Sequence, residues 1–333
     1  MTTRRALACS AAAVVAAVMV ACGFSPASAQ KREPLPRVGM LTPAPSATAK
    51  PSWDAFREAM KELGYVEGKS VVYEYRSAEG QIDRLPQLAG ELVKIPVKVM
   101  VVANTPGNLA AKKATTTIPI VMVAVGDPVR VGLVSNLGRP GGNITGFTNL
   151  TGELTAKRLQ LLKETIPTAT RIGAIGNPGD PNVLIQIQEA EAAARELKVQ
   201  LRVFTVKEAA QLEPAFEEAK AWRAQALLRL ADPFQATLRE RTIELAANAR
   251  MPMMYGTRAD VEAGGLIRYG VDVAESYRRA AGYVDKILKG AKPGELPVQQ
   301  PTKVELGVNL KTAAALNLKI PQAILARADQ VVQ

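Results

Sequence analysis

The chain has 333 residues, a length that suits two domains of ordinary size. It contains no histidine, so the commonest general base, the relay of a serine triad and the commonest metal ligand are all missing. The net charge is +11, but the basic residues are dispersed and the sequence has only six Phe and two Trp. These features argue against an enzyme and against a nucleic-acid partner.

The first thirty residues have the pattern of a secretory signal peptide. Arg4 and Arg5 precede an apolar run over residues 6–21, and Ala27-Ser28-Ala29 provides a small-x-small cleavage site. The run is shorter than the roughly 20 residues that a membrane-spanning helix needs. We therefore expect residues 1–29 to be removed and the remaining chain to reach the periplasm.

A second processing site is an alternative. The segment Met19-Val20-Ala21-Cys22 resembles a bacterial lipoprotein box, with Met where Leu is usual, and lipidation of Cys22 would tether the protein to the membrane. Both cysteines, Cys9 and Cys22, precede the cleavage site after Ala29. Processing at Ala29 would thus leave a chain without a thiol, which excludes disulfides, thiol nucleophiles and cysteine-zinc sites.

From residue 31 onward, short β-branched runs alternate with amphipathic helical patterns, which is typical of βαβ units around a parallel sheet. In the stretch 52–63, for example, Phe56, Met60 and Leu63 share one helix face. The elements predicted in the first half are strand 38–41, helix 52–63, strand 71–75, helix 84–93, strand 97–102, helix 106–114 and strand 120–123.

The same series then begins again. Its predicted elements are strand 171–175, helix 183–197, strand 201–206, helix 212–220, strand 226–230, helix 234–249 and strand 253–255. Local motifs repeat as well, since Arg37-Val38-Gly39 corresponds to Arg171-Ile172-Gly173, and Gly141-Gly142 corresponds to Gly264-Gly265. A repeat of this length predicts an α/β protein with two similar open lobes, each built on its own parallel sheet.

Each half ends in a Gly-Gly turn and an extended run, 143–147 and 266–270, and a third extended run covers 304–309. Three strands could therefore cross between the lobes as a hinge that permits bending; the alternative is that they are edge strands. Helix 274–288 would return to lobe one. We predict that lobe one comprises residues 30–145 and 271–295, and that lobe two comprises residues 146–270 and 296–333.

Candidate ligand-binding residues lie where the predicted strands end. In open α/β sheets, ligands bind at the carboxyl ends of strands, where helix N-termini present backbone N–H groups. The polar residues chosen on this basis are Thr42, Ser46, Asn104, Thr105 and Asp127 in lobe one, and Asn177, Asp232 and Tyr255 in lobe two, with Asp180 following the same strand as Asn177.

Several of these residues have two possible roles. Thr105, Asp127 and Asp232 each precede a proline, which is typical of a helix N-cap or a turn. Thr105 could also hold a ligand carboxylate together with helix N–H groups, and a carboxylate of Asp127 or Asp232 could receive an ammonium group. Asn177 could instead shape a turn with the Pro and Gly that follow it.

Sequence motifs of other protein classes are absent. There is no G-x-G-x-x-G after a strand, no P-loop, no G-x-S-x-G elbow and no cluster with metal-ligand spacing. We therefore expect a binding protein rather than an enzyme, with no cofactor and no metal.

Five segments carry a resemblance to a known family: ELGYVEG at 62–68, ATTTIPIV at 114–121, VGDPV at 125–129, RPGGNITG at 139–146 and AGGLIRYG at 263–270. With these segments the chain resembles the ABC transporter substrate-binding family that includes the tryptophan/tyrosine-type binding proteins and has the type I periplasmic binding fold. The resemblance covers nearly all of the processed chain. One departure is Asn104-Thr105-Pro106, where the family usually has Gly-Thr-Pro, so the resemblance does not fix the ligand.

The resemblance implies a small amino-acid-like or carboxylate-bearing ligand in the cleft between the lobes. It also implies that the closed form delivers this ligand to an ABC permease, which works with a separate ATPase. We expect a monomer. The alternative from another class is a periplasmic ligand sensor that reports to a receptor or chemoreceptor, and no feature within the chain separates these two functions.

Overall fold

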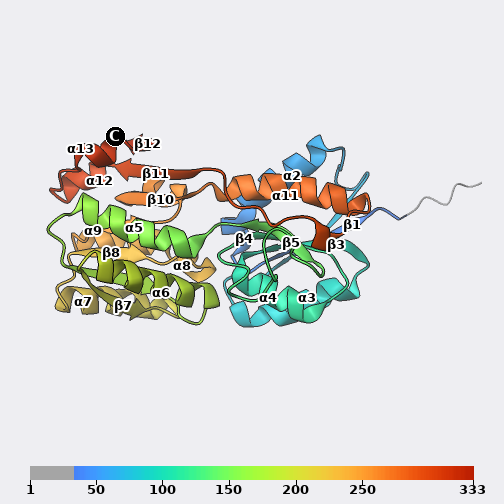
Figure 1. Ribbon diagram of the computed structural model, residues 1–333, viewed down its shortest axis with the longest axis horizontal. Coiled ribbons are helices and arrows are strands. Elements are labelled where there is room, and N and C mark those ends of the chain that lie inside the picture. Colours follow the sequence, from blue (N-terminus) through green and yellow to red (C-terminus); the bar gives the residue numbers. More distant parts are fainter. Residues whose placement is uncertain (1–33) are drawn as a thin grey trace, which may run out of the picture. The chain divides into compact units, whose positions relative to one another are not determined.

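Residues 34–333, which the computed structural model describes, contain two separate β-sheets, each with helices on both faces (Figure 1). The predicted signal peptide and Cys22 lie outside the described residues, so their processing stays a prediction. Within residues 34–333, no helix has the length and apolar character needed to cross a membrane.

The first sheet is wholly parallel, with the strand order β2-β1-β3-β4-β5. Its strands are β1 (Arg37–Thr42), β2 (Val72–Ser77), β3 (Val97–Ala103), β4 (Ile120–Val125) and β5 (Ile144–Thr148). The strands β1 to β4 confirm the four strands predicted in the first half. The apolar runs of β3 and β4 are buried, as expected for a parallel sheet that is covered on both faces.

Two pairs of helices cover the first sheet. The helices α2 (Ser46–Glu62) and α11 (Val273–Leu288) pack against each other on one face, and α3 (Leu85–Lys94) and α4 (Asn104–Ala114) cover the other. Trp53 of α2 meets Tyr277 of α11 edge to face, with their ring centroids 4.9 Å apart. Aromatic packing of this kind joins a helix early in the chain to one more than two hundred residues later.

The second sheet has the order β12-β11-β10-β9-β8-β6-β7. Its strands are β6 (Arg171–Gly176), β7 (Gln200–Thr205), β8 (Ala226–Arg229), β9 (Met253–Tyr255), β10 (Ile267–Val271), β11 (Val304–Asn309) and β12 (Gln330–Val332). The strands β10 and β11 are antiparallel, whereas the other pairs are parallel. The second sheet is therefore mixed rather than wholly parallel, because β11 enters it on the way back from lobe one.

The second sheet is covered in the same way as the first. One face packs against α5 (Thr151–Thr165) and α6 (Pro181–Glu196), and the other against α7 (Leu212–Ala221) and α9 (Arg239–Asn248). The shorter elements are α8 (Pro233–Thr237), α10 (Arg258–Glu262), α12 (Leu310–Ala315), α13 (Gln322–Leu325), and the 3-10 turns η1 (Ile82–Arg84), η2 (Ala209–Gln211) and η3 (Pro293–Glu295).

The single helix predicted over 234–249 is wrong, because Leu238 interrupts it between α8 and α9. The Thr237 hydroxyl donates a hydrogen bond of 2.7 Å to the Phe234 carbonyl. A side chain that bonds the preceding turn in this way competes with the helical backbone pattern.

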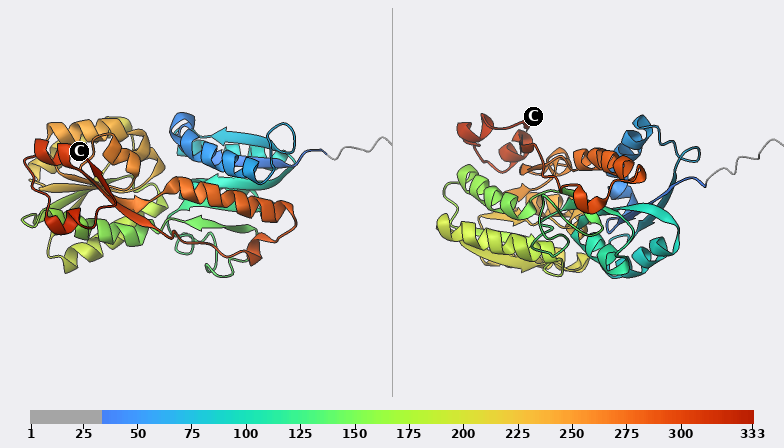
Figure 2. Two further views of the ribbon diagram at one scale, coloured as in Figure 1. Left: turned by 90° about the horizontal axis from the view of Figure 1, so that it is seen from above. Right: turned by 45° about the vertical axis from the view of Figure 1, so that its right-hand side comes forward.

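Three segments connect lobe one (β1–β5 with α2, α3, α4 and α11) to lobe two (β6–β12 with the remaining helices), as Figure 2 shows. The first joins β5 to α5, the second joins β10 to α11, and the third runs from Gln299, which pairs with Phe147, into β11. Because β5 pairs with β4 as far as Thr148, the first crossing lies beyond that residue.

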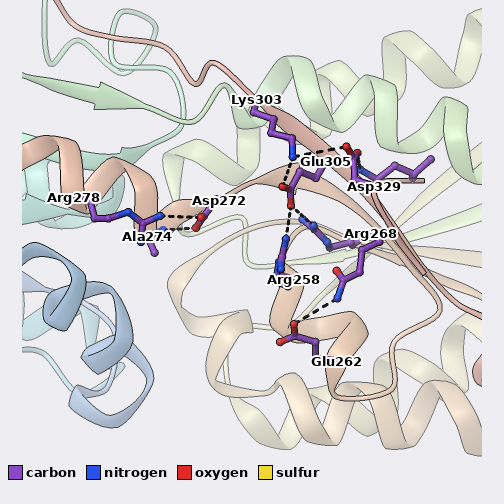
Figure 3. Close-up of polar contacts among 11 residues, drawn as sticks. Arg258, Glu262, Arg268, Asp272, Ala274, Arg278, Lys303, Glu305 and Asp329 are labelled. Carbon is purple, nitrogen blue, oxygen red and sulfur yellow. Dashed lines mark hydrogen bonds and ion pairs between the residues drawn. The ribbon is translucent and has the colours of Figure 1, made fainter. Parts of the chain in front are cut away.

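A cluster of ion pairs lies on β10, β11 and α10, beside the third crossing (Figure 3). Glu305 of β11 accepts hydrogen bonds from Arg268 at 2.5 Å, Lys303 at 2.9 Å and Arg258 at 3.0 Å. We call these four residues the Glu305 cluster. Arg268 is fully buried, so its guanidinium depends on this carboxylate for charge compensation.

Candidate functional site

A cavity of about 150 Å³ lies between the two lobes, at the carboxyl ends of strands from both sheets. A cavity of this size can hold a molecule about as large as benzene. Its lining comes mainly from loops and helix starts: Ala44, Asn104, Thr105, Ala124 and Val273 in lobe one, Asn149 in the first crossing, and Thr151, Asp180, Asn182, Arg229, Leu230, Ala231, Asp232, Pro233, Gln235, Ala236, Gly256 and Thr257 in lobe two.

The lobes touch each other beside this cavity. Gly126 of lobe one lies so close to lobe two that a Cβ atom there would be 1.7 Å from Asn182 Oδ1 and 2.3 Å from Thr151 Oγ1. Farther out, Arg130 forms an ion pair of 2.6 Å with Glu189 of α6 and donates to Gln188. The described structure is therefore a closed arrangement in which both lobes contribute to the cavity wall.

Asp180 is the N-cap of α6 and faces the cavity. Its Oδ1 accepts a hydrogen bond of 2.8 Å from the Asn182 amide, while Oδ2 is buried and has no hydrogen-bond partner among residues 34–333. The residue is only 1% exposed. Burial raises the pKa of Asp180 to about 7, against the hydrogen bond from Asn182, which lowers it, and the negative charge of Asp232 adds to the rise.

Asp232 has the same arrangement at the start of α8, which confirms its predicted capping role. Its Oδ1 accepts from the Gln235 amide at 2.6 Å, and its Oδ2 is buried without a partner in the described chain. Burial raises the pKa of Asp232 to about 6, although the hydrogen bond from Gln235 lowers it. We call Asp180 and Asp232 the acid pair.

Arg229, at the end of β8, lies in the same wall of the cavity and is 5% exposed. Its Nη2 donates to Asp260 Oδ1 at 2.6 Å, and Arg239 binds the same oxygen at 3.0 Å. Burial alone would raise the pKa of Asp260, but the charges of Arg229 and Arg239 and a hydrogen bond from Thr257 hold it below its ordinary value. Arg229 Nη1 has no partner among the residues that the structure describes.

Lobe one contributes the start of α4. Asn104 begins this helix with φ at 59°, a left-handed conformation that glycine adopts without strain and asparagine tolerates. This explains why Asn can stand where the family pattern has Gly. The predicted capping role of Thr105 is wrong, because Ala103 is the N-cap and Thr105 lies inside the first turn, where its hydroxyl accepts from the Gly126 amide at 3.5 Å.

Of the sequence-predicted residues, Asn104, Thr105, Asp180 and Asp232 line this cavity, whereas Thr42, Ser46, Asp127, Asn177 and Tyr255 do not. Thr42 is buried and accepts from the Ala44 amide, and Ser46 bonds Glu79 at an exposed position. Asn177 accepts from the Gly179 amide at 2.9 Å, which supports its interpretation as a turn residue.

Two further predicted residues lie near the cavity but face elsewhere. Asp127 accepts from the amides of Val129 and Arg130 and lines a separate hollow on the other side of Gly126. Tyr255 is buried in lobe two, with its ring 5.2 Å from the Arg229 guanidinium.

Several cavity residues were not among the predicted ones, notably Asn149, Thr151, Asn182, Arg229 and Gln235. One sequence signal was available for the acid pair, because Asp180-Pro181 repeats the Asp232-Pro233 pattern of a capped helix. Thr151 and Asn182 bond each other at 2.8 Å, a contact between positions thirty-one residues apart. The described residues contain no group of three or more side chains placed to hold a metal ion.

The fold and the cavity define a two-lobed α/β ligand-binding protein. The chain belongs to the family of ABC transporter substrate binding proteins, whose sequence profile matches residues 43–332. Proteins of this family bind small-molecule solutes, work with ABC permeases and typically act outside the cytoplasm.

The chain is also similar to individual proteins and solved structures. The chain is 25% identical over 264 residues to a tyrosine-binding protein of Clostridioides difficile (strain R20291), covering 79% of this chain and 76% of that protein. A crystal structure of a conserved domain protein from Vibrio cholerae is similar with a TM-score of 0.85 at 30% identity. An ABC domain from Streptococcus pneumonia in complex with L-Trp gives 0.84 at 24% identity. Both structures cover 90% of this chain and are themselves covered completely.

Proposed function

We propose that this protein is the periplasmic solute-binding component of an ABC uptake transporter, and that it delivers an amino-acid-like or carboxylate-bearing ligand to the permease as a monomer. The observation that carries the proposal is the interlobe cavity, whose lining residues Asp180, Asp232 and Arg229 each have a buried polar atom without a hydrogen-bond partner within the described chain. Buried polar groups are normally hydrogen-bonded, so unpartnered ones in a cavity point to a ligand.

The two ends of the cavity suit the two charges of an amino acid. Thr105 and the first backbone N–H groups of α4 favour an anion such as a carboxylate. On the side of lobe two, Asp232 can accept from an ammonium group. The tyrosine-binding relative and the L-Trp complex support an amino acid as the ligand.

Binding without catalysis fits the chemistry of the lining. The described cavity residues include no serine, cysteine, lysine or histidine, and the threonines and aspartates of the lining have no lysine or histidine among them to act as a base. In the acid pair, one oxygen of each carboxylate already accepts a capping hydrogen bond from a helix amide. We therefore propose capture and release as the whole activity.

The direct test is a thermal-shift screen of the processed protein against amino acids and small carboxylates, after removal of co-purified ligand, followed by calorimetry. Thr105→Val should weaken the binding of a hit by about 1–3 kcal/mol, because a charged hydrogen bond is lost. Ser46→Ala, outside the cavity, is the matched control. A Thr105→Val variant that binds as tightly as the parent would show that the ligand carboxylate lies elsewhere.

Closure has its own test at Gly126. A methyl group there would collide with Asn182 and Thr151 in the closed arrangement, so Gly126→Ala should favour the open form and weaken binding by roughly 10- to 100-fold. Gly90→Ala in α3 is the control, since nothing lies near its Cβ position. Small-angle scattering with saturating ligand should show a more compact parent than Gly126→Ala. Equal compaction of both would contradict closure over this cavity.

A further inference from the structure

The interlobe cavity is small compared with an aromatic amino acid. Its volume of about 150 Å³ matches that of a cavity that holds benzene, a molecule of six heavy atoms. The backbone of a free amino acid has five heavy atoms, so alanine has six and valine eight, whereas tyrosine has thirteen and tryptophan fifteen. Tyrosine and tryptophan are thus roughly twice as large as the molecule that a cavity of this volume holds.

The contact between the lobes limits how far the cavity can grow. Gly126 of lobe one already lies against Thr151 and Asn182 of lobe two, since a Cβ atom at Gly126 would be 1.7 Å from Asn182 Oδ1. Thr151 and Asn182 line the cavity while Gly126 lines the separate hollow, so this contact stands between the two spaces. A ligand longer than the cavity must therefore hold the lobes apart, which breaks the Gly126 contact and the ion pair between Arg130 and Glu189.

The wall of the cavity suits an aliphatic side chain better than a ring. None of the described residues that line it is aromatic. Phe234 and Tyr255 are neighbours of lining residues in sequence, but both pack into the apolar cluster on one face of the second sheet. The apolar part of the wall consists of alanines with Leu230, Pro233 and Val273. These side chains can contact an aliphatic group, but they offer no ring face on which an aromatic ligand could stack.

We propose that the ligand is an amino acid with a small aliphatic side chain of one to about three carbon atoms, such as alanine, valine or proline. The inference rests on the amino-acid-binding function proposed above and deepens it, because it adds the size of the side chain. Selection is steric. One methylene more or less in a fitted apolar pocket changes affinity by about 10- to 200-fold, and only a ligand that permits full closure gains contacts from both lobes.

The test is calorimetry on the processed protein, freed of co-purified ligand, with glycine, alanine, valine, proline, leucine, phenylalanine, tyrosine and tryptophan. We expect the tightest binding among alanine, valine and proline, and affinities at least about tenfold weaker for the three aromatic amino acids. Small-angle scattering at saturation gives a second readout that does not depend on affinity. A small amino acid should compact the protein more than any aromatic one that binds.

Two variants change the cavity in opposite directions. Val273→Ala removes two methyl groups from the wall, so it should improve the binding of leucine or phenylalanine relative to valine by about three- to tenfold. Val331→Ala, at an exposed position of β12, is its matched control. Ala236→Leu adds three carbon atoms to the wall and should weaken binding of the small amino acids by at least about tenfold. Its matched control is Ala221→Leu at the exposed end of α7.

The outcomes separate the size of the ligand from the function. If tyrosine or tryptophan binds the parent as tightly as alanine or valine, or if neither cavity variant changes the affinities of the parent, the small-ligand inference is wrong while amino-acid binding stands. If no amino acid binds the parent, the proposed amino-acid function is wrong and the inference falls with it. Circular dichroism and melting of the empty variants check that both remain folded.

Discussion

Lobe two holds two sets of carboxylates with buried oxygen atoms, and these sets have opposite surroundings. Glu305 accepts from Lys303, Arg268 and Arg258, and these hydrogen bonds lower its pKa to about 2. The acid pair has no such partners at its Oδ2 atoms within the described residues, and burial raises both pKa values instead. The two sites in lobe two thus shift the pKa of a carboxyl group in opposite directions.

The difference distinguishes a carboxylate whose charge stabilises the fold from carboxylates whose charge is left for a ligand to compensate. A carboxylate with cationic partners stabilises the native state, and removal of one member leaves the other uncompensated. A buried carboxylate without partners lowers stability, so it is expected where another molecule provides the missing charge. The first description fits Glu305, which links β11 to β10 and α10, and the second fits Asp180 and Asp232.

The largest expected effect is at Glu305. Glu305→Gln should lower the free energy of unfolding by about 2–3 kcal/mol at pH 7, because buried Arg268 loses its counter-charge. The value is below that of a fully buried pair, since Lys303 and Arg258 are exposed to water. Urea denaturation measures it, with Glu295→Gln as an exposed control.

The pH dependence at Glu305 has a definite sign. Its pKa is depressed from 4.5 to about 2, so the stability it contributes is complete above about pH 4.5 and is lost as pH falls toward 2. The deficit of Glu305→Gln should therefore shrink in acid. A deficit that is the same at pH 7 and pH 3 would contradict an electrostatic origin and point to packing.

The acid pair should respond in the opposite way. Asp180→Asn should raise the free energy of unfolding of the ligand-free protein by about 1–3 kcal/mol at pH 8, because it removes an unpaired buried charge and keeps the cap. The pKa is raised from 3.8 to about 7, so the parent is penalised progressively as pH rises through this range. The gain should vanish near pH 4. If Asp180→Asn destabilised the protein at pH 8, the contrast with Glu305 would be wrong. Asp127→Asn is the control.

The sequence predicted the parts of the fold that depend on local periodicity. The alternating runs located β1 to β4 and β6 to β9, and the internal repeat indicated two lobes. The sequence did not predict the interruption at Leu238 or the short elements α12, α13 and β12. These features depend on side-chain bonds and packing across the lobe rather than on a repeating pattern.

The site was predicted only in part, for a similar reason. The rule that ligands bind at strand ends selected Asn104, Thr105, Asp180 and Asp232, which line the cavity, and their role in ligand binding stays a prediction. The rule could not show that the Asn177 side chain accepts a hydrogen bond within a turn, or that Asp180 Oδ2 has no hydrogen-bond partner in the described chain. In the sequence, Arg229 lies at the end of a predicted buried strand. Local patterns do not indicate its ion pair, because the partner Asp260 lies thirty-one residues away in sequence.

The smallest expected effect concerns closure, and it tests whether the burial of the acid pair depends on closure. Arg130 and Glu189 join the two lobes through an ion pair with side chains 41% and 33% exposed. Exposed pairs contribute about 0.2–1 kcal/mol, so Arg130→Ala should weaken ligand binding by about two- to fivefold, with Arg139→Ala as the control. An opened cleft also lets water reach Asp180, so the stabilisation by Asp180→Asn at pH 8 should be smaller in the Arg130→Ala background than in the parent. A double-mutant cycle by urea denaturation measures this coupling. If the two changes were strictly additive, the cost at Asp180 would not arise from closure, and the contrast with Glu305 would reflect the local surroundings of lobe two alone.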